Sequence, residues 1–343
     1  MTHRSANDQN QGPELRRDPV VDRWIIIAKE RAGRPSDFIK AQKNEAKEDS
    51  VCPFCPGNEN LTPPEVFAHR QPNTQPNQPG WQIRVVPNRF PALIIESPLK
   101  RQGEGIYDHM SGTGAHEVII ETPDHSTQLA DLAETQIFEV VKTYKERALD
   151  LTKDLRFKYI LIFKNHGQTA GASLRHTHSQ LIAMPVVPKL VKEELDGSQR
   201  YFDFRQRCIF CDILKQELED GRRFIAQNQD FISLAPFAPR FPFETWIIAR
   251  QHFASFNSLN DDEIKSLAQI LRITLQKMNR ALNNPDYNYI VHTAPSDDPE
   301  PVFYHFHLEL MPKLTQIAGF EVGSGFYINP TPPEAAAKYL REI

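Results

Sequence analysis

The sequence lacks the long apolar runs and the strong charge bias that mark two large classes of protein. No stretch of the 343 residues approaches the roughly 18 consecutive apolar residues of a membrane-spanning helix. The first residues, MTHRSANDQNQGPE, are polar and have no apolar core of a signal peptide. The formal net charge is −4 with both signs interspersed, so no surface for non-specific nucleic-acid binding is expected. We therefore expect a cytoplasmic protein that binds neither a membrane nor a nucleic acid.

Cysteine is also scarce, and its arrangement is informative. The four cysteines form two pairs of equal spacing, Cys52-Pro-Phe-Cys55 and Cys208-Ile-Phe-Cys211. A disulfide framework is not expected in a chain of this size without a secretion signal. The pairs fit either a redox motif or metal-binding knuckles. A thioredoxin-like role is disfavoured because neither pair is expected to open a helix after a strand, where the thiol pKa would be lowered.

Short apolar runs alternate with two long helical patterns along most of the chain. Strands are expected over residues 24–27, 118–120, 159–163, 245–248 and 289–291. Helices are expected over residues 132–154 and 261–284. Each helix follows a capping-box pattern, Asp131-x-x-Glu134 in the first case and Asn260-x-x-Glu263 in the second.

These elements recur in the same order, which predicts a diverged duplication. Each copy contains a CxxC pair, a strand, a histidine before the long helix, and a final His-x-His segment. The corresponding histidines are His125, His176 and His178 in the first copy, and His252, His305 and His307 in the second. We predict an α+β fold of two half-domains, residues 14–190 and 195–343, each with an antiparallel sheet and a long helix.

Each copy offers two cysteines and two histidines, which are common ligands of a closed, structural zinc site. The predicted ligands are Cys52, Cys55, His125 and His176 in the first copy, and Cys208, Cys211, His252 and His305 in the second. His116 competes with His125, and the repeat favours His125 because it aligns with His252. Histidines that are merely packed in a core are the alternative, and two matched sets argue against it.

His178 lies two residues after His176, so both project from one face of an extended chain. With His176 on a metal, His178 keeps a free nitrogen, and a neutral imidazole is a good nucleophile near pH 7. The preceding segment, residues 165–173, has small residues whose backbone N–H groups can approach an anion. An ordinary turn is the alternative for this segment. Ser173 and Gln180 add neutral donors.

The two copies differ at the position of Gln180, which is Glu309 in the second copy. A carboxylate beside a transferring phosphoryl group would repel it. We therefore assign covalent chemistry to the first copy, and expect His307 to be vestigial or to pack near the second metal. Arg31, Arg34 and Asn88 are candidates for binding a second phosphate, with solvated surface positions as the alternative.

The motif HTHSQ at residues 176–180, the two CxxC pairs and the duplicated layout resemble the galactose-1-phosphate uridylyltransferase branch of the histidine-triad superfamily. Matching stretches run from Arg17-Asp-Pro to Ile328-Asn-Pro and include TPDHS at residues 122–126 and GFE at residues 319–321. The resemblance implies two histidine-triad-like halves and a double displacement. In that reaction His178 attacks the α-phosphorus of a nucleotide sugar, and the nucleotidyl group then passes to a second sugar 1-phosphate.

The resemblance also implies roles for individual residues. Gln180 would donate to the phosphoryl group, and Glu321 would bind a sugar hydroxyl. The nucleotide site would be lined by Asn88, Asn165, Gly171 and Ser173, and the donor would contact Arg31 and Arg34. Relatives commonly form homodimers, so a homodimer is expected.

Two departures affect the choice of substrate. Thr177 stands where the best-known uridylyltransferases have proline, and Ser179 stands where they have glycine. Together with the second CxxC pair, these residues resemble the plant-type relatives, some of which are ADP-glucose phosphorylases. The default expectation is transfer from UDP-glucose to galactose 1-phosphate, in galactose metabolism. The alternatives are adenylyl transfer from ADP-glucose to phosphate or sulfate, and a non-catalytic zinc-binding module.

Overall fold

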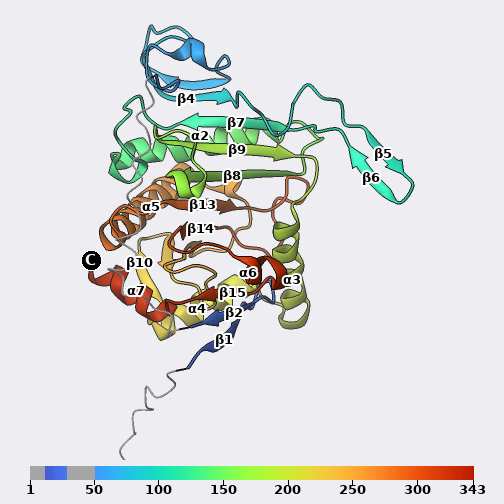
Figure 1. The fold of residues 1–343 in the computed structure, drawn as a ribbon, viewed down its shortest axis with the longest axis vertical. Helices are drawn as coiled ribbons and strands as arrows, with labels where there is room; N and C mark the ends of the chain where they lie inside the picture. Colours follow the sequence, from blue (N-terminus) through green and yellow to red (C-terminus); the bar gives the residue numbers. More distant parts are fainter. Residues whose placement is uncertain (1–11, 29–50) are drawn as a thin grey trace, which may run out of the picture.

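The computed structural model of the protein describes residues 12–28 and 51–343. Arg31 and Arg34 lie outside the described residues. A ten-stranded sheet crosses the molecule, and two long helices lie side by side against it (Figure 1). No helix in the described part of the chain is long and apolar enough to cross a membrane.

The sheet is entirely antiparallel and contains the same strand order twice. Its first five strands are β3 (Phe67–Arg70), β4 (Trp81–Pro87), β7 (Ala115–Ile120), β9 (His178–Met184) and β8 (Tyr159–His166), in spatial order. Their counterparts are β10 (Phe224–Gln227), β11 (Phe231–Leu234), β12 (Thr245–Ala249), β14 (His307–Pro312) and β13 (Tyr287–His292). The duplicated α+β fold is thus confirmed. The two half-sheets are continuous, because β8 pairs with β13.

The two long helices, α2 (Glu134–Leu151) and α5 (Asp261–Leu282), occupy equivalent places in the two halves. Their apolar side chains, among them Ile137 and Leu271, share one buried cluster with strand residues such as Leu181 and Leu310. This cluster joins both halves into one core, and it lies on one face of the sheet. The metal-ligand candidates and His178 do not belong to it, and Cys52 and Cys208 lie in two smaller clusters on the opposite side of the sheet.

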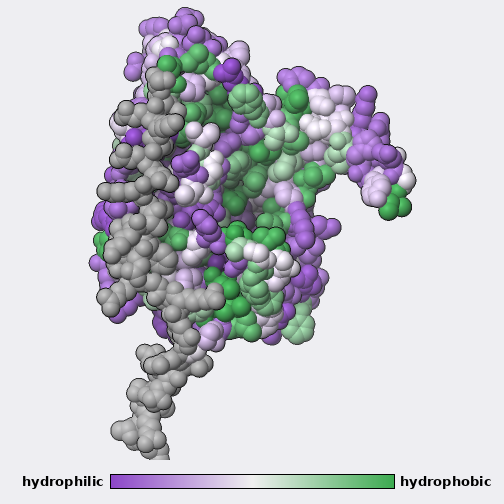
Figure 2. Space-filling model, in the orientation of Figure 1, coloured by the Kyte–Doolittle hydropathy of each residue, from purple (hydrophilic) through white to green (hydrophobic). Residues whose placement is uncertain are grey.

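The remaining elements surround this core. A small sheet is formed by β1 (Glu14–Arg17), β2 (Trp24–Ile27) and β15 (Tyr327–Asn329), and a hairpin by β5 (Arg101–Glu104) and β6 (Tyr107–Met110). The other helices are α3 (Lys189–Arg205), α4 (Ile209–Asp220), α6 (Gly319–Ser324) and α7 (Pro333–Glu342). The short 3-10 helices are η3 (Glu59–Leu61), η4 (Leu129–Asp131), η5 (Gln168–Ala170) and η6 (Phe256–Ser258). The hairpin projects from the body, and Figure 2 shows apolar atoms exposed at its tip, where Ile106 is 89% exposed.

All five predicted strands are present, although most extend beyond the predicted bounds. The predicted start of the first long helix is wrong. Asp131 is the last residue of η4, and α2 begins three residues later, at Glu134. The N-cap of α2 is Ala133, and no capping box is present. At α5 the capping box is present: Glu263 N donates to Asn260 Oδ1 (3.0 Å), and Asn260 N donates to Glu263 Oε2 (2.8 Å).

This difference gives a test of the capping argument. Replacing Asn260 by alanine leaves backbone N–H groups of α5 without an acceptor and should lower the free energy of unfolding by about 1 kcal/mol. The matched variant Asp131→Ala should have a much smaller effect, because Asp131 does not cap α2. Urea unfolding followed by circular dichroism measures both, and equal losses would contradict the assignment.

Candidate active site and metal centres

Side-chain alternation along residues 176–181 separates the site from the core. His178 and Gln180 face away from α2 and α5, on the same side as Ile120 and Val118 of the adjacent strand β7. Leu181 projects into the main core from the opposite side. This alternation places the predicted nucleophile and the predicted phosphoryl donor next to each other.

His178 is 6% exposed and is held in one tautomer. Its Nδ1–H donates to the carbonyl oxygen of His176 at 2.8 Å, so Nε2 carries the free lone pair. The Phe54 ring meets the His178 ring edge-on, with 5.3 Å between centroids. Burial lowers the pKa of His178 to about 4, and the neighbouring Lys164 charge acts in the same direction. The imidazole is therefore neutral at pH 7, as a nitrogen nucleophile must be.

Behind this strand lies a buried charged pair that the sequence reasoning did not single out. Lys164 Nζ donates to Glu121 Oε2 (2.7 Å), to Thr177 Oγ1 (2.9 Å) and to the carbonyl oxygen of His178 (2.8 Å). Thr177 and Ser179 also donate to Glu121. Burial alone would raise the pKa of Glu121, but Lys164 holds it below the ordinary value. Thr177 and Ser179, the two departures from the uridylyltransferase motif, thus both donate hydrogen bonds to one buried carboxylate.

The first predicted metal cluster is assembled. His125 Nδ1 lies 3.3 Å from Cys55 Sγ, and His176 Nδ1 lies 3.7 Å from the Sγ atoms of both Cys52 and Cys55. His176 Nε2–H donates to the carbonyl oxygen of Thr122 at 2.7 Å, which turns Nδ1 towards the two thiols.

The second cluster repeats this arrangement. His252 Nδ1 lies 3.5 Å from Cys211 Sγ, and His305 Nδ1 lies 3.5 Å from Cys211 Sγ and 3.9 Å from Cys208 Sγ. His305 Nε2–H donates to the carbonyl oxygen of Ala249 at 2.9 Å. Cys208 is the N-cap of α4, so the second pair opens a helix. This helix follows α3 and not a strand, and the two histidines still converge on the thiols.

Both clusters fit a tetrahedral metal ion. In each, the four donor atoms lie within 4.8 Å of one another. Ligands about 2.0–2.3 Å from a tetrahedral zinc ion lie about 3.3–3.8 Å apart, which is close to the separations observed. Each inner histidine also has a backbone carbonyl partner on its other nitrogen, as metal-bound histidines usually do.

A third buried group, also missed by the sequence reasoning, lies beside the second cluster. His292 lies 3.1 Å from Glu194 and 3.2 Å from Glu309, and its ring stacks on that of His307 with 4.4 Å between centroids. Burial lowers the pKa of His292, but the two carboxylates outweigh it and raise this pKa to about 10. The donor atoms of Glu194, His292, His307 and Glu309 lie within 4.8 Å of one another, so they have the spacing of a metal site as well as of an ion-pair network. His307 thus packs near the second cluster, which is one of the two alternatives expected for this residue.

The small-residue segment before His178 is held in place by side chains from the second half of the chain. Asp286 Oδ2 accepts from the backbone N–H (2.7 Å) and the hydroxyl (2.6 Å) of Thr169. Asn288 Nδ2 donates to Asn165 Oδ1 and to the carbonyl oxygen of Ala170, both at 2.8 Å. A Cβ atom on Gly167 would lie 1.9 Å from Asp286 Oδ1, so only glycine fits there.

Asn165 belongs to β8 and faces the same side of the sheet as Gln180, since Phe163 pairs with Gln180. Gly171 ends η5 with a positive φ of 90°, and Ser173 follows on the way to His176. Asn165 thus shares a sheet face with Gln180, and Gly171 and Ser173 lie in the segment that connects β8 with His176.

The side chains of Asn88, His116 and Gln180 meet on the other flank of His178. His116 Nε2 lies 2.8 Å from Gln180 Oε1, and Asn88 Nδ2 lies 3.5 Å from the same oxygen. His116, the competing metal-ligand candidate, is thus a neighbour of Gln180 and not of the thiols. Glu321 lies in α6, which adjoins β15 in the lower half of Figure 1, and its carboxylate accepts from the backbone N–H of the N-cap residue Ala318.

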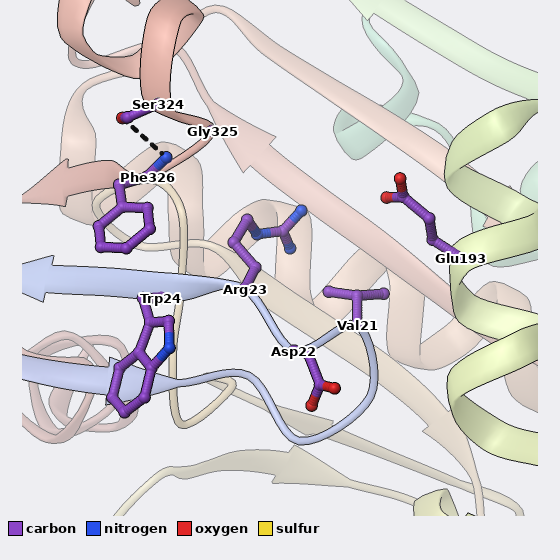
Figure 3. Close-up of a pocket in the computed structure, with 8 residues that line it drawn as sticks. All are labelled: Val21, Asp22, Arg23, Trp24, Glu193, Ser324, Gly325 and Phe326. Carbon is purple, nitrogen blue, oxygen red and sulfur yellow. Dashed lines mark hydrogen bonds between the residues drawn. The ribbon is translucent and has the colours of Figure 1, made fainter. Parts of the chain in front are cut away.

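A separate cavity of about 260 Å³ opens beside the start of β2 (Figure 3). Arg23 points into it between Val21 and Phe326, and Glu193 of α3 faces it from the other side. It contains none of the predicted site residues, so it is not the candidate site.

Comparisons with known proteins agree along the whole chain. The model of the galactose-1-phosphate uridyl transferase N-terminal domain matches residues 2–188, and that of the C-terminal domain matches residues 194–342. An ADP-glucose phosphorylase of Arabidopsis thaliana is 41% identical over 340 residues, covering 98% of this chain and 94% of the relative. A galactose-1-phosphate uridylyltransferase of Thermotoga maritima is 30% identical over 338 residues, covering 96% of this chain and 98% of the relative.

A solved structure extends this similarity to three dimensions. The crystal structure of an ADP-glucose phosphorylase from Arabidopsis thaliana with bound ADP-glucose superposes with a TM-score of 0.81. The two chains are 37% identical, and the match covers 97% of this chain and 99% of that chain.

The buried pair gives a stability test. Replacing Lys164 by methionine leaves the Glu121 carboxylate buried without a cation and should lower the free energy of unfolding by about 3–5 kcal/mol. The double variant Lys164→Met/Glu121→Gln should regain part of this loss, because it removes the uncompensated charge. Lys158→Met is the matched control, since its partner Asp297 is half exposed and the pair contributes at most about 1 kcal/mol. Similar losses for both lysines in chemical unfolding would contradict this account.

Proposed function

The chain belongs to the galactose-1-phosphate uridyl transferase family, and we propose that it transfers the adenylyl group of ADP-glucose to inorganic phosphate through a covalent intermediate on His178. The coarse activity, nucleotidyl transfer, follows from the family. The full-length 41% identity to an ADP-glucose phosphorylase carries the choice of nucleotide.

The default expectation, UDP-glucose with galactose 1-phosphate, has weaker support. The Thermotoga maritima uridylyltransferase is 30% identical to the chain, against 41% for the Arabidopsis thaliana phosphorylase. Thr177 and Ser179 also belong to a network around Glu121 that proline and glycine could not form, because neither has a side-chain hydroxyl. ADP-glucose is therefore the proposed donor, and UDP-glucose becomes the second candidate.

The proposed reaction has two displacements at one phosphorus atom. In the first, the lone pair of His178 Nε2 forms a P–N bond to the α-phosphorus of ADP-glucose, and the P–O bond to glucose 1-phosphate breaks. The proton on Nδ1 stays in its hydrogen bond to the His176 carbonyl and stabilises the imidazolium. In the second, an oxygen of phosphate forms a P–O bond to the same phosphorus and the P–N bond breaks. Its electron pair returns to Nε2, so ADP leaves and neutral His178 is restored.

Neutral donors surround the proposed reaction centre. Gln180, two residues from the nucleophile on the same face, would donate to a phosphoryl oxygen, where a carboxylate would repel it. Asn88, Asn165, Gly171 and Ser173 remain the proposed nucleotide contacts. Arg31 and Arg34 remain predictions for the donor, as do Glu321 for the sugar and the homodimer.

We propose zinc as the ion in both Cys2His2 clusters, since this donor set is typical of structural zinc. Zinc would neutralise the thiolates and hold the inner histidine of each His-x-His segment. In the first half this would fix His176, whose carbonyl oxygen in turn orients His178. The ion would thus support the nucleophile without activating water.

The zinc proposal predicts the metal content. Elemental analysis of the purified protein should give two zinc ions per chain, and Cys52→Ser and Cys208→Ser should each leave about one, because each removes a thiolate from a different cluster. Each variant is the control for the other. Chelation should also lower the melting temperature. A single ion in the wild-type protein, or unchanged content in either variant, would disprove the corresponding site.

The covalent mechanism predicts a labelled protein. Incubation with ADP-glucose labelled at the α-phosphorus, without acceptor, should yield an acid-labile adduct, and added phosphate should release the label as ADP. His178→Asn should abolish labelling, whereas the second-half variant His307→Asn should retain it per folded molecule. Labelling by UDP-glucose alone would favour uridylyl transfer, and no label from either donor would rule out the covalent intermediate.

A further inference from the structure

We infer that His116 is a positioning residue: it fixes the carboxamide of Gln180 so that the amide N–H groups face the transferred phosphoryl group. The contacts that carry this inference belong to the chain itself. Only the identity of the group that receives the hydrogen bond rests on the proposed function.

His116 lies on β7 opposite Ile182, so its side chain shares a sheet face with Gln180 and His178. Its carbonyl oxygen accepts from Asn88 N at 2.7 Å, which ties the end of β4 to this position. His116 therefore sits on a rigid, paired strand, which suits a side chain that must hold another one in place.

A backbone donor sets the tautomer of His116. The N–H of Ala92 donates to His116 Nδ1 at 3.1 Å, so this nitrogen carries the lone pair and the ring proton is on Nε2. Nε2–H then donates to Gln180 Oε1 at 2.8 Å. The backbone N–H is a donor whatever the state of the side chains, so the direction of both bonds follows from it.

Asn88 reinforces the same orientation. Its Oδ1 accepts from Phe90 N at 2.9 Å, which directs Nδ2 towards Gln180 Oε1 (3.5 Å). The 3.1 Å contact between Nδ2 and His116 Nε2 is then one between two donors that share this acceptor, and not a hydrogen bond. Two donors thus converge on one carbonyl oxygen. A rotated Gln180 would place its own N–H groups against both of them, so the amide group must point away from His116 and Asn88.

The second half of the chain shows what a different residue does at this position. The strand registers align Glu244 with His116, because Thr245 opposes Leu310 as Glu117 opposes Leu181. There Glu309 replaces Gln180, and Arg240 pairs with both Glu244 and Glu309. In both halves the residue at this position helps to fix the side chain two residues after the last histidine, and only in the first half is the result a neutral amide donor.

Two substitutions separate the two contacts of His116. Glutamine can place its Nε2 near the imidazole Nε2 and keep the donor to Gln180. Asparagine can keep an acceptor near Nδ1 for Ala92 N but is too short to reach Gln180. We expect His116→Asn to reduce the rate of His178 labelling at least tenfold with little change in KM, and His116→Gln to restore most of the rate.

A double mutant tests whether His116 acts through Gln180. His116→Asn/Gln180→Ala should be no slower than Gln180→Ala alone, because the residue to be positioned is already absent. Additive losses would overturn the inference, as would a His116→Asn enzyme that labels at the wild-type rate. Nitrogen NMR of the histidine rings gives a readout without substrate, and a His116 proton on Nδ1 would also overturn it.

The outcomes distinguish this inference from the proposed function. If the wild-type protein forms no adduct with ADP-glucose or UDP-glucose, the proposed function fails, while the NMR result still decides the role of His116. If the wild-type protein is labelled and the asparagine variant is not slowed, only the positioning role fails.

Discussion

The two-residue period of the strand that begins at His178 is the constraint on which the site depends. It sends Thr177 and Ser179 to the Glu121 carboxylate and keeps His176, His178 and Gln180 on the opposite face. A shift of one residue would exchange the two sets and bury the imidazoles in the core. The Lys164–Glu121 pair resists such a shift, because its hydrogen bonds need hydroxyl groups at both intervening positions.

Duplication supplied two copies of this arrangement, and they have diverged around one charge. Both halves keep a Cys2His2 cluster in which the inner histidine has a backbone carbonyl partner on its other ring nitrogen. At the second-half position of Gln180, Glu309 is balanced by Arg240 and His292, and His307 is fully buried between aromatic rings. An enclosed imidazole beside an ion-pair network offers little to a phosphoryl group. The second half has instead a supporting role, since Asp286 and Asn288 hold the segment that precedes His178.

Much of this could be predicted from local sequence. The strands and the capping box at Asn260 follow from short-range patterns, because side-chain period and capping are set within a few residues. The two ligand sets follow from the long repeat, which aligns each CxxC pair with histidines far along the chain. The start of α2 could not be predicted, since Asp131 has the right residue type for a cap but lies in a 3-10 turn two residues too early. The helix at Cys208 was missed because nothing in a CxxC motif separates a loop from a helix N-terminus.

The sequence by itself determined which residues form the two Cys2His2 clusters and which histidine of each His-x-His segment stays outside them, because the repeat aligns these residues without reference to the fold. Tertiary structure decided the rest. His116 became a partner of Gln180, Lys164 a partner of Glu121, and Asn288 a partner of Asn165, through contacts between strands that are distant in the chain. Such contacts depend on strand order and register, which bring together residues more than forty positions apart and leave no local pattern in the sequence.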